Sequence, residues 1–249
     1  MFVAPLCVLY CKLLRSAASF VPAAAPSAPD ETLAVNLCGE EVVLHADRAL
    51  GWPRERMLFV ADVHLGKGAA FRAGGIPLPR GATATDLARL ERLVAASRAT
   101  RLVVLGDFLH AASGRVDALD RAFRDWRERH ATLAILLVRG NHDSHAGDPP
   151  PSWGVELANE PHAMPPFLGC HHPAAPPTGY ALCGHIHPGV SIGHPAEPSV
   201  RMPCFVLGRR RAILPAFGRL TGLAAPPLLA GDNVVAIAGR SLVRLPSRG

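Results

Sequence analysis

Three short apolar segments, separated by two segments of helical periodicity, limit what this chain can fold into. Residues 57–61, 101–105 and 133–138 have the length and composition of buried strands. Between them, residues 85–99 and 117–130 carry apolar side chains at intervals of three and four, which is typical of amphipathic helices. Alternating strands and helices of this kind predict an α/β fold with a parallel sheet and right-handed crossovers.

The second half of the chain is rich in proline and glycine and predicts strands without a helix. Its short apolar runs lie at 167–170, 180–183, 204–207, 212–214, 234–237 and 242–245. We expect them to form a second, largely antiparallel sheet. Residues 33–45 partly alternate between apolar and polar and predict an entering strand or hairpin.

Five of the strand-like segments end in loops whose residues can bind metal ions or transfer protons. These residues are Asp62, His64, Asp107, Asn141, His142, Asp143, His171, His185 and His187. Functional groups of open α/β sheets gather beyond the carboxyl ends of the strands, so we expect the five loops to converge. Gly106, Gly140 and Gly184 stand beside them and would permit sharp turns and close backbone approach.

The residue types suit a site for two divalent metal ions. A carboxylate such as Asp107 can bridge two ions, and imidazoles with an amide carbonyl complete mixed nitrogen and oxygen sites. Two such ions neutralise the negative oxygens of a phosphodiester, which otherwise resist attack. In an extended segment, residues i and i+2 point the same way. Asp62 with His64, and His185 with His187, can therefore each direct two groups into one site.

Composition bears on the substrate and the compartment. The chain has 249 residues and a formal net charge of +6, which suits a polyanion such as nucleic acid. All but Lys12 and Lys67 of its basic residues are arginines, and GC-rich coding alone can produce that bias. The six cysteines form no CxxC pair, and a domain of this size needs no disulfides. Reduced thiols and a cytoplasmic location are the simpler interpretation.

The N-terminal segment is apolar but fits neither a secretion signal nor a membrane span. Lys12 and Arg15 lie inside the apolar run, whereas a signal peptide has its positive charge before it. The uninterrupted part is too short to cross a bilayer. We interpret residues 1–32 as a disordered extension or a start codon placed too early, with a signal peptide as the alternative. Residues 33–249 form the predicted domain, and we expect no membrane partner.

The ordered motifs resemble the complete set of the calcineurin-like metallophosphoesterases. They are DVH at 62–64, GD at 106–107, GNHD at 140–143, a histidine at 171 and GHIH at 184–187. Each motif is weak alone, but five in order after apolar strands are specific. The resemblance implies a four-layer α/β/β/α sandwich of the metallophosphoesterase type, with the metal ions at the strand ends.

The resemblance also implies a ligand set for two ions, most suitably Mn, with Fe, Zn, Co or Ni as alternatives. Asp62, His64 and His187 would bind the first ion. Asn141, His171 and His185 would bind the second ion, and Asp107 would bridge the two. His171 is preferred to its neighbour His172 because the family pattern places the ligand two residues before the proline, here Pro173.

Two further roles follow from position in the motifs. His142 would stabilise the transition state or protonate the leaving oxygen, and Asp143 would orient it. Lys67 and Arg72 follow the first metal loop directly, so we predict that they contact substrate phosphates. His110 lies near a motif loop and is interpreted as a supporting or surface residue.

A narrower resemblance covers most of residues 33–245. The stretches LFVADVHLGKGAAFRAGGIPLP, LVVLGDFLHA, LLVRGNHD, LCGHIHP, PCFVLG and LPAFGRLTG are similar to those of the bacterial ligase-associated DNA damage response endonucleases (PdeM-type). This resemblance implies a phosphodiesterase that cleaves DNA in repair and is associated with a DNA ligase, a helicase and an exonuclease. One alternative is a phosphodiesterase or phosphatase for a small nucleotide or phosphoester. Another is a non-catalytic scaffold, which would have lost ligands.

Overall fold

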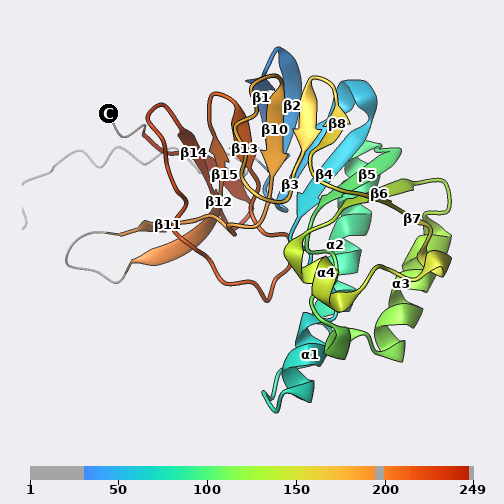
Figure 1. Ribbon diagram of the computed structural model, residues 1–249. Coiled ribbons are helices and arrows are strands. Elements are labelled where there is room, and N and C mark those ends of the chain that lie inside the picture. Colours follow the sequence, from blue (N-terminus) through green and yellow to red (C-terminus); the bar gives the residue numbers. More distant parts are fainter. Residues whose placement is uncertain (1–30, 194–198, 247–249) are drawn as a thin grey trace, which may run out of the picture.

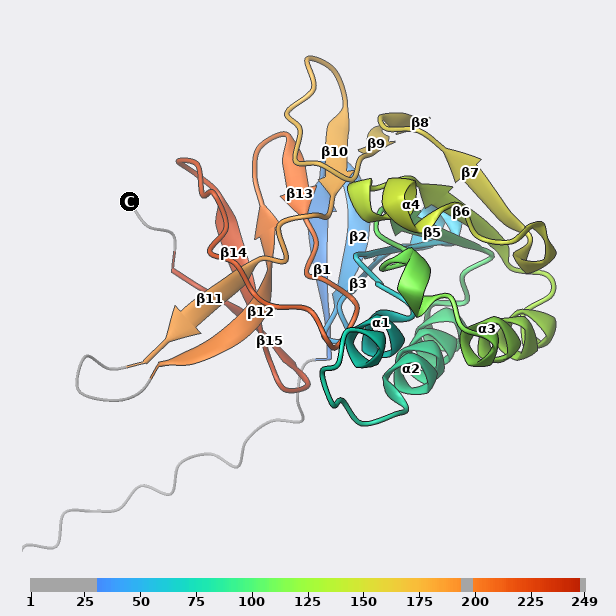
Figure 2. The same ribbon diagram turned by 60° about the horizontal axis from the view of Figure 1, so that its bottom comes forward.

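Two β-sheets pack face to face in the computed structural model, and helices cover the outer side of one of them (Figures 1 and 2). The structure describes residues 31–193 and 199–246. The predicted extension, residues 1–32, therefore lies almost entirely outside the described residues, and the first strand begins at Thr32.

The first sheet contains seven strands in chain order and confirms the predicted parallel strands with helices between them. Three antiparallel strands precede four parallel ones: β1 (Thr32–Leu37), β2 (Glu40–His45), β3 (Ala49–Trp52), then β4 (Met57–Ala61), β5 (Arg101–Leu105), β6 (Ala134–Val138) and β7 (Val155–Ala158). The helices are α1 (Lys67–Ala73), α2 (Ala82–Ser97), α3 (Asp117–Arg129) and α4 (Asn141–Ala146), with short 3₁₀ turns at Pro53–Glu55, Ala112–Gly114 and Pro151–Trp153.

The second sheet contains eight strands and is largely antiparallel, as predicted, with a parallel centre. Its strands are β8 (His162–Met164), β9 (Phe167–Gly169), β10 (Tyr180–Cys183), β11 (Gly189–Ile192), β12 (Val200–Leu207), β13 (Arg211–Ile213), β14 (Asn233–Ala238) and β15 (Ser241–Arg244). β10 pairs in parallel with both β9 and β13, while the other pairs are antiparallel. Because β9, β10 and β13 are parallel, their carboxyl ends lie at the same edge of the sheet.

Both faces of the first sheet are buried, which explains why its central strands are continuous apolar runs. In β4, Leu58 and Val60 face the helices, whereas Phe59 and Ala61 face the second sheet. The helix side is filled by α2 and α3, whose Phe123 stacks on Trp153 with ring centroids 4.0 Å apart. The predicted α/β sandwich is thus confirmed.

The described helices are distributed unevenly between the two sheets of the sandwich. All four α-helices of the described residues lie between β4 and β7 in the chain, and α2 and α3 cover the first sheet (Figure 2). The connections in the second half are short or rich in proline, as in residues 170–179, and a helix cannot continue through such segments. The described part of the second sheet therefore has strands and coil on its outer face, and the described helices of the sandwich belong to the first sheet.

Backbone hydrogen bonds join the two sheets where their parallel strands end. Phe217, which follows β13, donates its N–H to the carbonyl of Ala61 at 2.7 Å, and Gly218 donates to the carbonyl of Asp62 at 3.0 Å. Asp62 in turn donates its N–H to the carbonyl of Gly106 at 3.2 Å. The loops after β4, β5 and β13 are therefore fixed to one another, and they form a single edge.

A buried ion pair holds this junction. Arg89 on α2 lies 3.1 Å from Asp86, donates to the carbonyl of Phe217 and places its guanidinium 4.0 Å from the centre of the Phe217 ring. Arg48 donates to the carbonyl of Ala216 at 3.1 Å. Burial lowers the pKa of Arg89 to about 10, so the guanidinium remains charged at neutral pH. Contacts from Arg89 of α2 thus help to hold residues 214–222, the segment LPAFGRLTG, in place.

We expect Asp86→Ala to destabilise the protein by about 3–5 kcal/mol, because it leaves the buried Arg89 charge without its partner. Urea unfolding, followed by circular dichroism, measures this change. Glu91→Ala, on the same helix, removes an exposed partner of Arg129 and should leave the midpoint nearly unchanged. Equal shifts in the two variants would contradict a structural role for the buried pair.

Candidate metal centre

The seven predicted metal ligands meet at the edge where the strands of both sheets end. Asp62 and His64 follow β4, Asp107 follows β5 and Asn141 begins α4 after β6. From the second sheet, His171 follows β9, and His185 and His187 follow β10. The expected convergence of the five loops is therefore what the structure shows. Their side chains fall into two groups.

The first group consists of Asp62, His64 and His187, whose ligand atoms all lie within 4.8 Å of one another. The Nε2 atoms of His64 and His187 are 3.3 Å apart, and Nε2 of His187 is 3.7 Å from Oδ1 of Asp62. Two ring nitrogens at this distance cannot both present lone pairs unless a proton or a cation lies between them. These three residues are the ones predicted for the first ion.

The second group is centred on His171. Its Nε2 lies 2.9 Å from Oδ1 of Asn141, 3.0 Å from Nδ1 of His185 and 3.4 Å from Oδ1 of Asp107. Two imidazoles, an amide carbonyl and a carboxylate form the mixed nitrogen and oxygen donor set that divalent transition metals accept. His171 is completely buried, whereas the side chain of His172 is 50% exposed. The structure therefore places His171, the preferred histidine, in this group.

Asp107 lies between the two groups. Its Oδ2 is 3.8 Å from Nε2 of His64 in the first group, and its Oδ1 faces His171 in the second. The carboxylate is almost fully buried. A carboxylate with one oxygen toward each group has the geometry that a bridging ligand requires.

The environment keeps two of the ligand imidazoles, those of His64 and His185, neutral, which is the form that binds a metal ion. Burial, followed by the charge of Lys67, lowers the pKa of His64 to about 2. Burial and the neighbouring His171 and His172 also lower the pKa of His185. Both rings therefore offer lone pairs at neutral pH rather than positive charge.

The backbone at the site is strained. Five of the ligand residues adopt the left-handed conformation, with φ values between 50° and 71°: Asp62, His64, Asp107, His185 and His187. This conformation costs a non-glycine residue roughly 1–2 kcal/mol. Strain of this kind is characteristic of functional sites.

Two glycines make room for the ligands. A Cβ on Gly106 would collide with the ring of His171, and one on Gly140 would collide with the carboxylate of Asp107. The predicted role of glycines beside the ligands is thus visible as close contact. A side chain at either position would push a ligand away from the centre.

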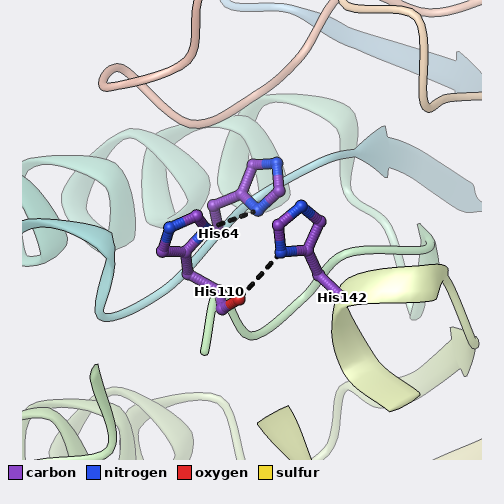
Figure 3. A group of neighbouring side chains, drawn as sticks. All are labelled: His64, His110 and His142. Carbon is purple, nitrogen blue, oxygen red and sulfur yellow. Dashed lines mark hydrogen bonds between the residues drawn. The ribbon is translucent and has the colours of Figure 1, made fainter. Parts of the chain in front are cut away.

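His142 and His110 form a second layer of histidines over His64 (Figure 3). Nδ1 of His142 donates to the carbonyl oxygen of His110 at 2.9 Å, and the two rings stack with centroids 5.0 Å apart. Nδ1 of His110 lies 3.4 Å from Nδ1 of His64, so His110 contacts both neighbours. Burial, then Lys67, lowers the pKa of His110 to about 4. His110 therefore supports the site residues around it, in agreement with one of the two interpretations given to it from the sequence.

Asp143 does not have the position expected for an orienting group. Its carboxylate is buried and accepts the backbone N–H groups of Leu109 and Gly140 at 3.0 and 2.9 Å. It therefore ties the start of α4 to the loop after β5. His110, not Asp143, provides the hydrogen bond that orients the His142 ring.

The two predicted substrate contacts have different surroundings. Lys67 begins α1, and its pKa is lowered by burial, while the nearby charges of Asp107 and Asp62 raise it. Its ammonium thus lies within electrostatic reach of the metal ligands. Arg72, one turn later, donates to the carbonyls of Leu78 and Pro79 at 3.3 Å and holds the loop after α1. Contact of either side chain with substrate stays a prediction.

The fold and the clustered ligands define a metal-dependent phosphoesterase. The family model for calcineurin-like phosphoesterases matches residues 55–188, more than half of the chain, and the chain therefore belongs to this family. Its members use divalent metal ions, and the described residues include groups that can hold them. None of the described helices is long and apolar enough to cross a membrane.

Among solved structures, the chain is similar to the nuclease MPE of Pseudomonas putida. The two share 38% sequence identity with a TM-score of 0.75, over 86% of this chain and 100% of the nuclease. A phosphoesterase from E. coli, Yfce, aligns at 16% identity with a TM-score of 0.37, over 77% of this chain and 99% of its own, and this likeness bears on neither fold nor mechanism. No protein with a curated function matches the sequence.

Asp107→Asn should reduce the metal content by at least one ion per chain, because the bridging position loses its charge. Mass spectrometry of the reconstituted protein measures metal content, and its melting temperature without metal shows whether the fold survives. Asp148→Asn alters an exposed carboxylate paired with Arg139 and should change neither value. Full occupancy in the Asp107 variant would reject the bridging role.

Proposed function

We propose that the protein is a phosphodiesterase with two metal ions that cleaves DNA as an endonuclease in repair. The observation that carries this proposal is the position of Asp107 between two ligand groups drawn from both sheets. The similarity to the nuclease MPE supports a nucleic acid as substrate. We further propose a functional association with a DNA ligase, a helicase and an exonuclease, which the motif resemblance implies.

Each ligand group would hold one divalent ion. Asp62, His64 and His187 fit the first, Asn141, His171 and His185 the second, and Asp107 both. Manganese suits the mixture of imidazole and oxygen donors, with Fe, Zn, Co or Ni as alternatives. When bound, the ions would supply Lewis-acid stabilisation of the phosphoryl charge and activation of the attacking water.

The protein's own groups position and protonate the substrate. Because Nδ1 of His142 is bound to a carbonyl, it carries a hydrogen, and Nε2 is the atom that exchanges a proton. The backbone N–H of His142 donates to Asp107 at 2.9 Å, which fixes the ring beside the metal centre. In the protonated ring, Nε2 also carries a hydrogen, which it would donate to the oxygen that leaves, and the ring would return to its neutral form with the hydrogen on Nδ1. Lys67 would pair with a phosphate oxygen.

The exposure of the site suits a polymer better than a small enclosed substrate. Asp62, Asp107 and His171 are buried at its base, whereas His110, His142, His185 and His187 are partly exposed around them. A net charge of +6 adds attraction for a polyanion. The four described cysteines are free thiols, which fits the cytoplasmic location that we propose. Hydrolysis of a small nucleotide or phosphoester is the competing function.

His142→Ala should slow cleavage of DNA by about 10²–10⁴-fold, the usual contribution of a general acid. The loss should be much smaller for bis-p-nitrophenyl phosphate, because p-nitrophenolate leaves without protonation. Steady-state rates on both substrates, with metal content measured in parallel, separate proton transfer from metal binding. Equal losses on the two substrates would argue against proton donation by His142.

DNA binding by the metal-free protein should weaken steeply with salt, because bound phosphates release counterions. Lys67→Ala should lower the slope of log K against log salt by about 0.7–0.9, the value for one phosphate contact. Arg54→Ala is the matched control, since Arg54 is exposed beside the amino end of β4, away from the metal loops.

Activity assays choose between the two substrate classes. We would compare single- and double-stranded DNA, a cyclic nucleotide and p-nitrophenyl phosphate with several metals. Activity should vanish in excess chelator and return best with Mn²⁺. Efficient turnover of the cyclic nucleotide without DNA binding at low salt would favour the small-substrate function, and full activity in chelator would overturn the metal mechanism.

A further inference from the structure

A carboxylate–histidine pair lies at the rim of the second ligand group. Glu160 follows β7, and His172 follows His171 after β9. Oε1 of Glu160 lies 2.6 Å from Nδ1 of His172, and Oε2 accepts the backbone N–H groups of His171 and His172 at 2.7 and 2.9 Å. One carboxylate therefore fixes both the turn and the ring of His172.

This contact determines which nitrogen of His172 is available. A carboxylate oxygen only accepts, so Nδ1 carries a hydrogen and Nε2 is the nitrogen that this contact leaves free for a metal ion. Histidines that bind metal ions almost always donate their other ring N–H to a carboxylate, a carbonyl or water. His172 thus has the tautomer and the support of a metal ligand, although the catalytic set described above does not include it.

The ring of His172 also lies close enough to two other ligands. His171, His172 and His185 each offer a nitrogen, and these atoms lie within 4.8 Å of one another. The ring centroids of His172 and His185 are 4.4 Å apart. With half of its side chain exposed, His172 faces solvent, whereas Asp107, which lies near Nε2 of His171, is buried.

We propose that His171, His172 and His185 form an outer metal position that overlaps the inner one and selects late transition-metal ions. This inference rests on the proposed function, because the inner position is the second ion of that mechanism. The two positions share His171 and His185, so an ion can occupy only one of them at a time. An ion at the outer position lacks Asp107 as a ligand.

The donor atoms of the two positions differ in the ions that they prefer. The inner position includes oxygens of Asp107 and Asn141, which suit Mn²⁺. The outer position offers imidazole nitrogens, for which affinity rises from Mn²⁺ toward Ni²⁺, Cu²⁺ and Zn²⁺. Zn²⁺ should therefore displace Mn²⁺ from the second site and inhibit the Mn²⁺-loaded enzyme.

Competition between the two ions tests this directly. Mn²⁺ released from the full-length protein during a Zn²⁺ titration is measured by electron paramagnetic resonance, without reference to activity. His172→Ala removes a direct ligand and should raise the Zn²⁺ concentration for half-displacement by at least about tenfold, the smallest effect usual for loss of an outer-shell partner of a ligand. Its affinity for Mn²⁺ should change far less. Glu160→Gln keeps an acceptor for the backbone and should produce a shift in the same direction.

Two controls keep the outcomes distinct. His162→Ala removes a histidine of β8 that is outside both ligand groups, and it should alter neither the Zn²⁺ titration nor the activity. His172→Gln repeats the main test with a side chain of similar size if the alanine variant folds poorly. An unchanged ratio of Zn²⁺ to Mn²⁺ affinity in the His172 variants would overturn the outer position alone. Failure of the unaltered protein to bind either ion would overturn the metal mechanism as well.

Discussion

The site depends on the hydrogen bonds that join the ends of the two sheets. Neither sheet holds a complete ligand group, because His187 comes from the second sheet and Asp62 and His64 come from the first. Phe217 bonds to Ala61 at the junction, so a shift of one sheet against the other would separate the groups. The buried charge of Arg89 is tolerated because it fixes this contact.

Without metal ions, the close arrangement of the ligand side chains is energetically unfavourable. Several imidazole nitrogens and two carboxylates point at one another across about 3 to 4 Å, with few hydrogen atoms to share. The rest of the fold therefore has to force the assembly, and divalent ions relieve it. Because the fold has to hold the ligands together, the supporting contacts are made with backbone groups. The Asp143 carboxylate accepts two backbone N–H groups, and the His142 ring donates to a backbone carbonyl.

The sequence predicts the parts of this structure that are local. A strand and its motif are adjacent in the chain, so Asp62, Asp107 and His171 could be placed from pattern alone. Glu160 could not be placed in this way, because its partner His171 lies 11 residues away and no motif marks Glu160. The pair of Asp86 and Arg89 could not be placed either, because its partner Phe217 lies on another element and no motif marks the pair. The fourth helical layer was inferred from resemblance, and the proline-rich connections of the second sheet contain no helix within the residues that the structure describes. Asp143 adjoins His142 in sequence, but consecutive residues of a helix point in different directions.

The left-handed backbone conformation of five ligand residues lowers the stability of the fold, although the metal site needs these residues. Glycine or asparagine would adopt the same backbone at Asp62 or His187 with less strain, so a chain that gave up catalysis could gain stability at these positions. Substitutions that relieve this backbone strain would therefore raise stability but remove catalytic activity. Metal ions that bind the folded form and not the unfolded chain would offset this cost, so the metal-free fold is the less stable of the two.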